Sequence, residues 1–379
     1  MNFRDLQKQY KELKPEIDSA INDVLSSARF ISGPQVKELE DQLAQYVGVK
    51  HCITCANGTD AITLAMMAWN IGEGDAVFVP DFTFFSSGEC PAFSGATPIF
   101  VDVNERTFNI DTDKLEESIK KVLKEGLLTP KAVIAVDLFG LPADYENIRK
   151  ICEKYNLYLM EDGAQGFGGS INGKMACSFG DISTTSFFPA KPLGCYGDGG
   201  AVFTDNDEWA SLLRSYAVHG KNGSDKYDNC RIGMNSRLDT LQAAVLLPKF
   251  KAFKEYEIDN VNIVAAKYGE KLRNSGLVLP LVPDGYVSSW AQYTVQLSEN
   301  IDRDKLISHM RDNGIPSMVY YARPMHTQGA FVGTRSALVD NEVTQKLCKT
   351  VLSLPMHPYL ESEDINKVCD CVLEFLSDE

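Results

Sequence analysis

Short apolar runs that alternate with helical patterns constrain the fold of this chain more than any other feature of its sequence. Helical patterns such as Thr59–Trp69 and Tyr145–Tyr155 lie between the runs. Strands that alternate with helices are typical of a mainly parallel sheet with helices on both faces, so we predict an α/β fold. The apolar runs are His51–Cys55, Ala76–Pro80, Thr97–Val101, Ala132–Asp137, Leu157–Met160, Ile182–Phe187 and Ala201–Phe203.

The sequence beyond residue 235 has a different pattern. Apolar residues at helical spacing predict a long helix from about Asp239 to Arg273, which Pro248 is expected to kink. Ala291–Leu297 alternates apolar and polar residues and predicts a strand with one face in water. The remaining expected elements are a helix that begins at Asp302 and stops at Gly314, a strand over Ile315–Tyr321 and a closing helix over Glu361–Phe375.

Length and charge bound the class of protein. The chain has 379 residues, which is enough for more than one domain. We predict a large α/β domain over residues 1–250, including an N-terminal arm, and a small α+β domain over residues 251–379. The net charge of −15 argues against a general nucleic-acid binder or a binder of anionic membranes. An anionic small-molecule substrate remains compatible, because it needs only a local pocket of donors.

The composition indicates a protein of a reducing cytoplasm. The first residues lack the apolar core of a signal peptide, and no run of about 18 apolar residues occurs. The chain is too long to need a disulfide scaffold, so its ten cysteines are expected to be free thiols. Cys52 and Cys55 have the spacing of half a zinc site. No second such pair occurs and the five histidines are scattered, so no metal site is expected.

Candidate ligand-binding residues follow the predicted strands, because ligands of parallel sheets gather at the carboxyl ends of the strands. After the first run, Gly58 would let the backbone approach a ligand closely. Thr59 offers a hydroxyl at a helix N-terminus, which favours phosphate, although an ordinary capped turn explains the pair equally well. Further along, the phenylalanines around Phe84 form either core or a stacking platform.

Two charged residues at strand ends indicate a reactive site. Asp162 follows an apolar run, where a carboxylate is costly unless it meets a cation such as a protonated heterocycle nitrogen. Lys191 follows the run Ile182–Phe187, and desolvation there would lower the pKa of its amine and make it able to form an imine. A solvated loop lysine is the alternative. The glycines of 194–200 form no nucleotide fingerprint, because they precede a strand.

Together these residues predict a site for pyridoxal 5′-phosphate (PLP). The predicted phosphate-binding group, called the phosphate cup below, consists of Gly58, Thr59 and Ser186. An aromatic surface, a carboxylate and a lysine are the other three features of the site. A planar, phosphorylated, cationic heterocycle with an aldehyde satisfies all four features.

Over its whole length the chain resembles the DegT/StrS family of PLP-dependent sugar aminotransferases. So many motifs in one order make the resemblance specific, and it implies a fold-type I (aspartate aminotransferase-like) PLP transferase. The matching motifs are Asn57-Gly-Thr-Asp-Ala61, Pro80-x-x-Thr-Phe84, Glu161-Asp-x-Ala-Gln165, Ser186-Phe-Phe-Pro-x-Lys191-x-Leu-Gly, Gly197-Asp-Gly-Gly200, His219-Gly220, the run from Gly233 to Ala244 and Leu354-Pro-Met-His-Pro358.

The run from Asn235 to Ala244 is most similar to the WbpE-like subgroup. Those enzymes aminate C3 of a UDP-linked 2-acetamido-3-keto uronic acid for surface polysaccharides. The resemblance therefore implies that L-glutamate donates an amino group to a keto carbon of a UDP-sugar, expected to be C3, in ping-pong order.

The resemblance also implies roles for the residues of the predicted site. Lys191 would hold PLP through its amine and move a proton during transfer. Asp162 would keep the pyridine nitrogen protonated, Phe84 would stack on the ring, and Gln165 would lie by the phenolic oxygen. The phosphate cup would bind the phosphate.

Further residues would serve a shared site and the substrates. Asn235 would reach the phosphate in the neighbouring subunit, and Arg237, also from the partner, suits a carboxylate, so a homodimer is implied. Tyr320, Tyr321 and His326 would face the substrate. Tyr320 stands where some members have His, which leaves the exact sugar open, and packing of the small domain explains both tyrosines equally well.

The sequence assigns no single role to three further positions. Gly163 stands where many members have Ala beside the aspartate. His357 could be read as a general base, but a capped turn before the last helix is the better interpretation. Ordering of the loop before Asn235 would be enough to explain His219.

Alternatives remain at this point. A C4 aminotransferase on a 4-keto-6-deoxy nucleotide sugar would keep the fold. The sugar dehydratase branch of the family has His at the lysine position, so Lys191 argues against it. A PLP-binding regulator without turnover would be expected to lack an intact set or to carry a DNA-binding segment. A metal hydrolase is remoter, since no ligand spacing is present.

Overall fold

A seven-stranded, mainly parallel sheet organises the described part of the chain, as predicted. The computed structural model describes residues 1–223, 227–337 and 339–378. The strand order is β1-β9-β8-β5-β4-β2-β3, and only β9 runs antiparallel to its neighbours in this sheet. The strands are β1 (His51–Cys55), β2 (Asp75–Pro80), β3 (Thr97–Val101), β4 (Thr129–Val136), β5 (Tyr158–Asp162), β8 (Ile182–Ser186) and β9 (Gly200–Thr204).

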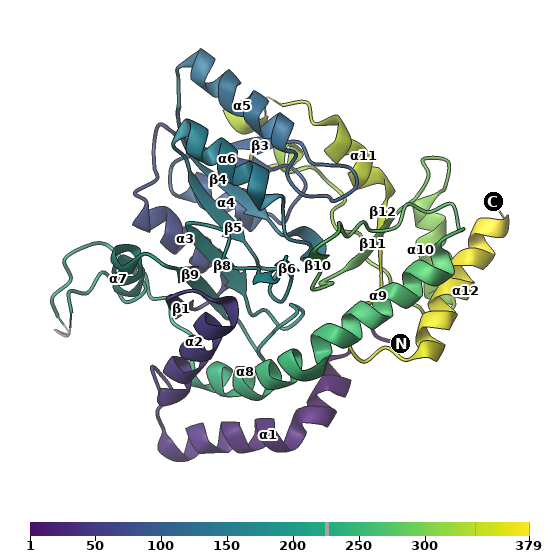
Figure 1. Cartoon of the computed structure of the whole chain (residues 1–379), viewed down its shortest axis with the longest axis horizontal. Coiled ribbons are helices and arrows are strands. Elements are labelled where there is room, and N and C mark those ends of the chain that lie inside the picture. The colour runs from purple at the N-terminus through teal and green to yellow at the C-terminus, as the bar shows by residue number, and fades with distance from the viewer. Residues whose placement is uncertain (224–226, 338, 379) are drawn as a thin grey trace.

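Helices cover both faces of this sheet (Figure 1). Alternate residues of β2 show why, since Val77 and Val79 pack into one buried cluster while Ala76 and Phe78 pack into another. The first cluster lies under α3, α4 and α7, and the second under α5 and α6. These helices are α3 (Gly58–Ala68), α4 (Ser86–Phe93), α5 (Thr112–Glu125), α6 (Tyr145–Tyr155) and α7 (Asp207–Tyr216).

A third cluster joins the β1–β9 end of the sheet to α2 (Pro34–Val47) and α8 (Thr240–Ala252). Leu39 and Leu43 of α2 pack there with Phe250 of α8. Helix α1 (Leu6–Ser27) lies along α8 on the outside of the molecule (Figure 1). The first residues of the chain then lie beside the C-terminal part, because the Met356 amide donates to the Phe3 carbonyl over 3.1 Å.

The last third of the chain builds a second core around a short antiparallel pair, β11 (Tyr293–Gln296) and β12 (Val351–Leu354). Helices α9 (Ile258–Leu272), α10 (Arg303–Asp312) and α12 (Ser362–Asp378) pack on this pair. The remaining elements are α11 (Glu342–Thr350), a small sheet of β10 (Tyr286–Val287), β6 (Ser170–Ile171) and β7 (Lys174–Met175), a π turn at Phe253–Glu257, and 3₁₀ turns at Leu138–Gly140, Met325–Thr327 and Arg335–Ala337.

Several local predictions are confirmed. Helix α6 has the predicted bounds, and Asp302 caps α10 by accepting hydrogen bonds from the amides of Asp304 and Lys305 at 3.0 and 3.1 Å. The long helix is present as α8 and α9. The irregularity within it is the π turn at Phe253–Glu257, and α8 continues past Pro248 as regular helix.

Two strand predictions are wrong. Strand β11 has no wet face, because all four of its residues are buried. Its polar side chains are satisfied inside the protein: the hydroxyls of Thr294 and Ser353 share a 2.7 Å hydrogen bond, and the Gln296 amide donates to the Glu105 carbonyl. Residues 315–321 form no strand, and only Met318 pairs with Ser353 as an isolated bridge.

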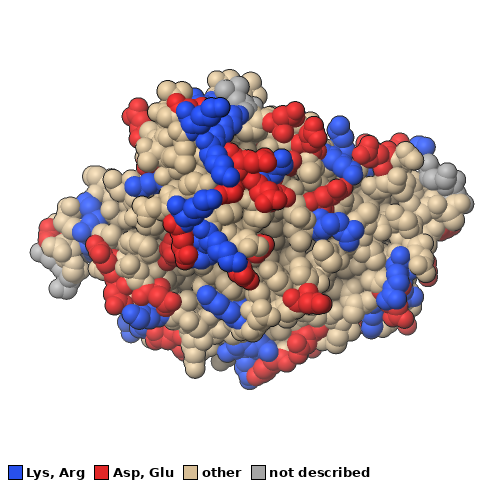
Figure 2. Space-filling model, turned by 45° about the horizontal axis from the view of Figure 1, so that its top comes forward, with Lys and Arg blue, Asp and Glu red and all other residues tan. Residues whose placement is uncertain are grey.

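The surface carries no single sign of charge on the face seen in Figure 2, where Lys and Arg are interspersed with Asp and Glu. Within the described residues, no helix is long and apolar enough to cross a membrane.

Candidate active site

A cavity of about 660 Å³ opens at the carboxyl ends of β1, β5 and β8, within the usual range for small-molecule sites. Residues distant in the sequence meet there because parallel strands end at the same edge of the sheet. Nine of the predicted site residues line it: Gly58, Thr59, Phe84, Asp162, Gln165, Ser186, Lys191, Tyr320 and Tyr321.

The start of α3 and the end of β8 form one end of the cavity. Asn57 caps α3, since its side-chain oxygen accepts a 2.8 Å hydrogen bond from the Asp60 amide. A Cβ at Gly58 would lie 2.8 Å from the Cβ of Ser186, so only glycine lets these two segments approach so closely. The free amides of a helix N-terminus beside two hydroxyls suit a phosphate group. This geometry supports the predicted phosphate cup.

Asp162 lies at the end of β5 and is buried. Its carboxylate accepts hydrogen bonds from the Ser87 hydroxyl at 2.8 Å and the Ala164 amide at 3.2 Å. Burial raises the pKa of the carboxyl group, and the two donors together with the nearby Lys191 charge oppose that rise. A carboxylate held this way is stabilised further by a cation, which a protonated pyridine nitrogen provides.

Lys191 lies in the turn after β8, where its amide donates to the Phe188 carbonyl over 2.8 Å. Enclosure by protein lowers the pKa of its amine, the Asp162 carboxylate opposes this change, and the Arg4 guanidinium adds to it. A lowered pKa increases the neutral fraction of the amine, which is the form that attacks an aldehyde. The side chain therefore suits covalent attachment of an aldehyde cofactor.

Aromatic and amide groups line the space between these two ends. The Phe84 ring is 53% exposed and lies 6.5 Å from the Tyr321 ring. Gln165 accepts a 2.8 Å hydrogen bond from the Phe139 amide, so its own amide group is directed into the cavity, where it donates to the Tyr321 hydroxyl over 3.1 Å. A flat ring fits beside Phe84, with a side-chain amide available for its oxygen. The residues present thus fit PLP in charge, shape and chemistry.

Sequence reasoning missed Ser87 and gave Asn57 no site role. Ser87 holds Asp162, although Ser87 lies in the first turn of α4 and Asp162 ends β5, so no local pattern connects them. Asn57 could have been found from its position directly before Gly58-Thr59, which is typical of an N-cap. Gln292, directly before β11, also lines the cavity.

His326 is buried away from the cavity surface. Its ring nitrogen Nδ1 lies 2.5 Å from the Asp81 carboxylate, which also accepts a 3.0 Å hydrogen bond from the Asn341 amide. The hydrogen bond to Asp81 raises the pKa of the His326 imidazole. The geometry gives this histidine a tethering position that holds the segment carrying Tyr320 and Tyr321 against the end of β2.

Asn235 and Arg237 also lie outside this cavity. The Arg237 guanidinium donates a 2.6 Å hydrogen bond to the Asn235 side chain, and Arg237 lines a separate open groove with His219 and Arg231.

Packing and backbone contacts explain the three ambiguous positions, Gly163, His357 and His219. A Cβ at Gly163 would lie 2.6 Å from the sulfur of Cys177, so Cys177 fills the space that an alanine would need. His357 accepts a 3.3 Å hydrogen bond from the Tyr359 amide, as a turn residue does, and burial lowers its pKa to about 4. His219 has a left-handed backbone, and its amide donates to the Met234 carbonyl.

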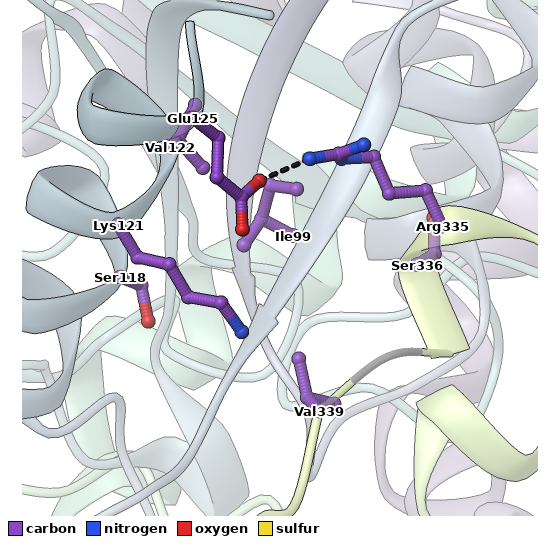
Figure 3. Close-up of a pocket in the computed structure, with 8 residues that line it drawn as sticks. All are labelled: Ile99, Ser118, Lys121, Val122, Glu125, Arg335, Ser336 and Val339. Carbon is purple, nitrogen blue, oxygen red and sulfur yellow. Dashed lines mark hydrogen bonds and ion pairs between the residues drawn. The ribbon is translucent and has the colours of Figure 1, made fainter. Parts of the chain in front are cut away.

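A second cavity, of about 120 Å³, lies between α5 and the turn at Arg335–Ala337 (Figure 3). Figure 3 shows the Glu125–Arg335 ion pair across it and Lys121 on the neighbouring turn of α5. This space is too small for a cofactor with a nucleotide sugar. Among the residues that the structure describes, no cluster of His, Cys, Asp and Glu could hold a metal ion.

Comparisons with known proteins agree with this chemistry. The profile of the DegT/DnrJ/EryC1/StrS aminotransferase family matches residues 11–373. UDP-2-acetamido-2-deoxy-3-oxo-D-glucuronate aminotransferase of Pseudomonas aeruginosa is 43% identical, over 97% of this chain and 98% of the relative. UDP-N-acetyl-3-dehydro-alpha-D-glucosamine 3-aminotransferase of Acidithiobacillus ferrooxidans is 40% identical, over 97% of this chain and 96% of the relative.

Solved structures show the same likeness. An aminotransferase of this family from Brucella abortus has a TM-score of 0.95 and 46% identity over 99% of both chains. A Bacillus subtilis protein solved with bound cofactor PMP has a TM-score of 0.88 and 30% identity, over 97% of this chain and 82% of that one.

Proposed function

Because this chain belongs to the DegT/DnrJ/EryC1/StrS aminotransferase family, we propose that it moves the amino group of L-glutamate to the C3 keto group of a UDP-linked sugar. The acceptor is a 2-acetamido-3-keto uronic acid or a close analogue, and the product serves surface polysaccharide synthesis. The enzyme is a PLP-dependent sugar aminotransferase. One observation carries the proposal: Lys191 and Asp162 line a single cavity with a helix N-terminus suited to phosphate.

The chain's own residues would divide the work as follows. PLP supplies an electron sink that stabilises negative charge on the carbon next to the transferred nitrogen. Asp162 would hold a proton on the ring nitrogen, with Ser87 and the Ala164 amide keeping the carboxylate in place. The Lys191 amine would take the proton from the substrate carbon and return it at the cofactor carbon. Phe84 would orient the ring, and the start of α3 would anchor the phosphate.

A homodimer with shared sites is part of the proposal. Asn235 is exposed and Arg237 lies with it outside the cavity of its own chain, so both are available to a second copy. Exposed apolar side chains such as Phe30, Ile31 and Ile232 support an additional covered surface, because large apolar groups are stabilised when they leave water.

The proposal also includes a boundary between two domains near residue 250 and a location of the protein in the cytoplasm. Residues 261–375 form a core of their own, which supports a small C-terminal domain, although Met325 and Leu347 pack into the core of the large sheet. All ten cysteines are free thiols, which supports a reducing compartment.

The first test uses the visible absorbance of the protein loaded with PLP. L-Glutamate should bleach the band of the bound cofactor as the first half-reaction proceeds, and a UDP-3-keto sugar should then restore it. A 4-keto-6-deoxy nucleotide sugar serves as the matched acceptor. Return of the band only with the 4-keto sugar would contradict C3 amination. A band that glutamate leaves unchanged would contradict the donor and favour a regulator without turnover.

Mixing two inactive variants tests the shared site. One chain carries Lys191→Ala and the other carries Arg237→Ala, and each alone should have little activity. In a mixed dimer one site regains both wild-type residues, so a random mixture should recover about one quarter of wild-type turnover. The control mixes Lys191→Ala with wild-type chains at the same ratio. No recovery after unfolding and joint refolding would show that Arg237 acts within its own chain.

A further inference from the structure

The N-terminal arm brings Phe3, the residue before Arg4, against Tyr320 of the cavity lining. Phe3 is held by the hydrogen bond from the Met356 amide, and the Phe3 ring packs edge-on against Tyr320 at 6.3 Å. On the other side of Arg4, Asp5 caps α1 by accepting a 2.9 Å hydrogen bond from the Lys8 amide. Arg4 therefore lies between two residues with defined contacts, one position from the Phe3 ring that packs on Tyr320, and Tyr320 lines the cavity.

The hydrogen-bond donors of the Arg4 guanidinium are unused among the residues that the structure describes. It is half-buried, yet it makes no hydrogen bond or ion pair with any residue in the described part of the chain. Enclosure by protein lowers its pKa to about 10, and its charge in turn lowers the pKa of the Lys191 amine. A guanidinium withdrawn from water is costly unless an acceptor faces it.

A second buried cation, Lys249, lies near enough to Arg4 that the Arg4 charge lowers the pKa of the Lys249 amine. Lys249 is buried, with its amine 4.9 Å from the centre of the Tyr196 ring, and no carboxylate in the described part of the chain is bonded to it. Glu257 is the carboxylate that acts on both cations, but its oxygen already accepts hydrogen bonds from Gln9 at 2.8 Å and Tyr359 at 2.6 Å. Among the described residues, neither the Arg4 guanidinium nor the Lys249 amine has a carboxylate in an ion pair with it, so a further anion is favoured there.

We propose that Arg4 binds a carboxylate of the substrate at the Tyr320 end of the cavity and thereby sets specificity for acidic ligands. The planar guanidinium fork binds a carboxylate through two parallel hydrogen bonds. The carboxylate comes from C6 of an acidic sugar or from the side chain of the amino donor. Because ping-pong substrates occupy one cavity in turn, one arginine can serve both. The inference rests on the proposed function, since it assigns the ligands to that site.

Binding measurements with unreactive probes test this directly. UDP-glucuronic acid and UDP-glucose differ only in the C6 group, and glutarate with its monoamide is the matched pair for the donor. Calorimetric titration of the PLP-loaded protein should show tighter binding of the acidic member of at least one pair. Arg4→Gln should weaken that member about 10- to 100-fold and leave the neutral member unchanged. Arg4→Lys should recover part of the loss.

Controls separate this outcome from others. Lys11→Gln removes one exposed charge from the same arm and should change neither pair. If Arg4→Gln weakens binding of UDP-glucuronic acid, the ligand of Arg4 is the C6 carboxylate of the sugar. If it weakens binding of glutarate, the ligand is the carboxylate of the donor. Weaker binding of both supports a shared role. Equal weakening of both UDP-sugars would point to the diphosphate and overturn the inference, as would absence of any effect or of binding. Bleaching by glutamate is measured separately, so a failure of the proposed function is recognised on its own.

Discussion

Replacing Lys191 by alanine is expected to lower turnover by at least about 10⁴-fold, the upper end of what a general acid–base contributes. The amine is the only lysine nitrogen among the residues that line the described cavity, and enclosure there lowers its pKa. Its loss removes both the covalent anchor of the cofactor and the proton carrier. Rates are measured in single turnover with the protein already loaded with the amino form of the cofactor, so that weaker loading does not obscure the chemistry.

Lys191→Arg is the matched control for charge. Arginine keeps the positive charge beside Asp162 but does not give up its proton in proteins, so turnover should fall as far as in Lys191→Ala. Cofactor should still bind through its phosphate and ring. Turnover within about tenfold of wild type in either variant would contradict the assignment of Lys191 as the proton carrier.

Asp162→Asn is expected to lower the rate of the glutamate half-reaction by about 10²- to 10³-fold, as when a preorganised electrostatic partner is removed. Asparagine has nearly the same shape, and the Ser87 hydroxyl can reverse its hydrogen bond to accept from the new amide. The ring nitrogen would lose its anionic partner and with it the proton. The absorbance band of the bound cofactor should shift, which a purely structural defect does not cause.

Ser87→Ala provides the graded comparison for Asp162. It removes one of the two hydrogen bonds to the carboxylate and keeps the charge, so the rate should fall only about tenfold. An Asp162→Asn protein that is folded, loaded and as fast as Ser87→Ala would show that the charge of Asp162 is not used.

Local patterns predicted the elements that depend on neighbours in sequence. Helix α6 and strands β1 and β3 have the predicted bounds, because propensity, capping and apolar spacing act within a few residues. The failures lie where packing overrides pattern. The alternating run in β11 is buried on both sides, since β12 and the loop at Glu105 supply partners for its polar groups. Residues 315–321 lack a partner strand along their length.

The sequence by itself determined the parallel sheet and predicted nine of the residues that line the cavity, because their motifs follow strand ends that a parallel sheet must bring together. Only the tertiary structure decided contacts between segments with no common pattern: Ser87 with Asp162, His326 with Asp81, and Phe3 with Tyr320. Each contact joins residues far apart in sequence. Their distances depend on how helices and loops pack on the sheet, which no local spacing encodes.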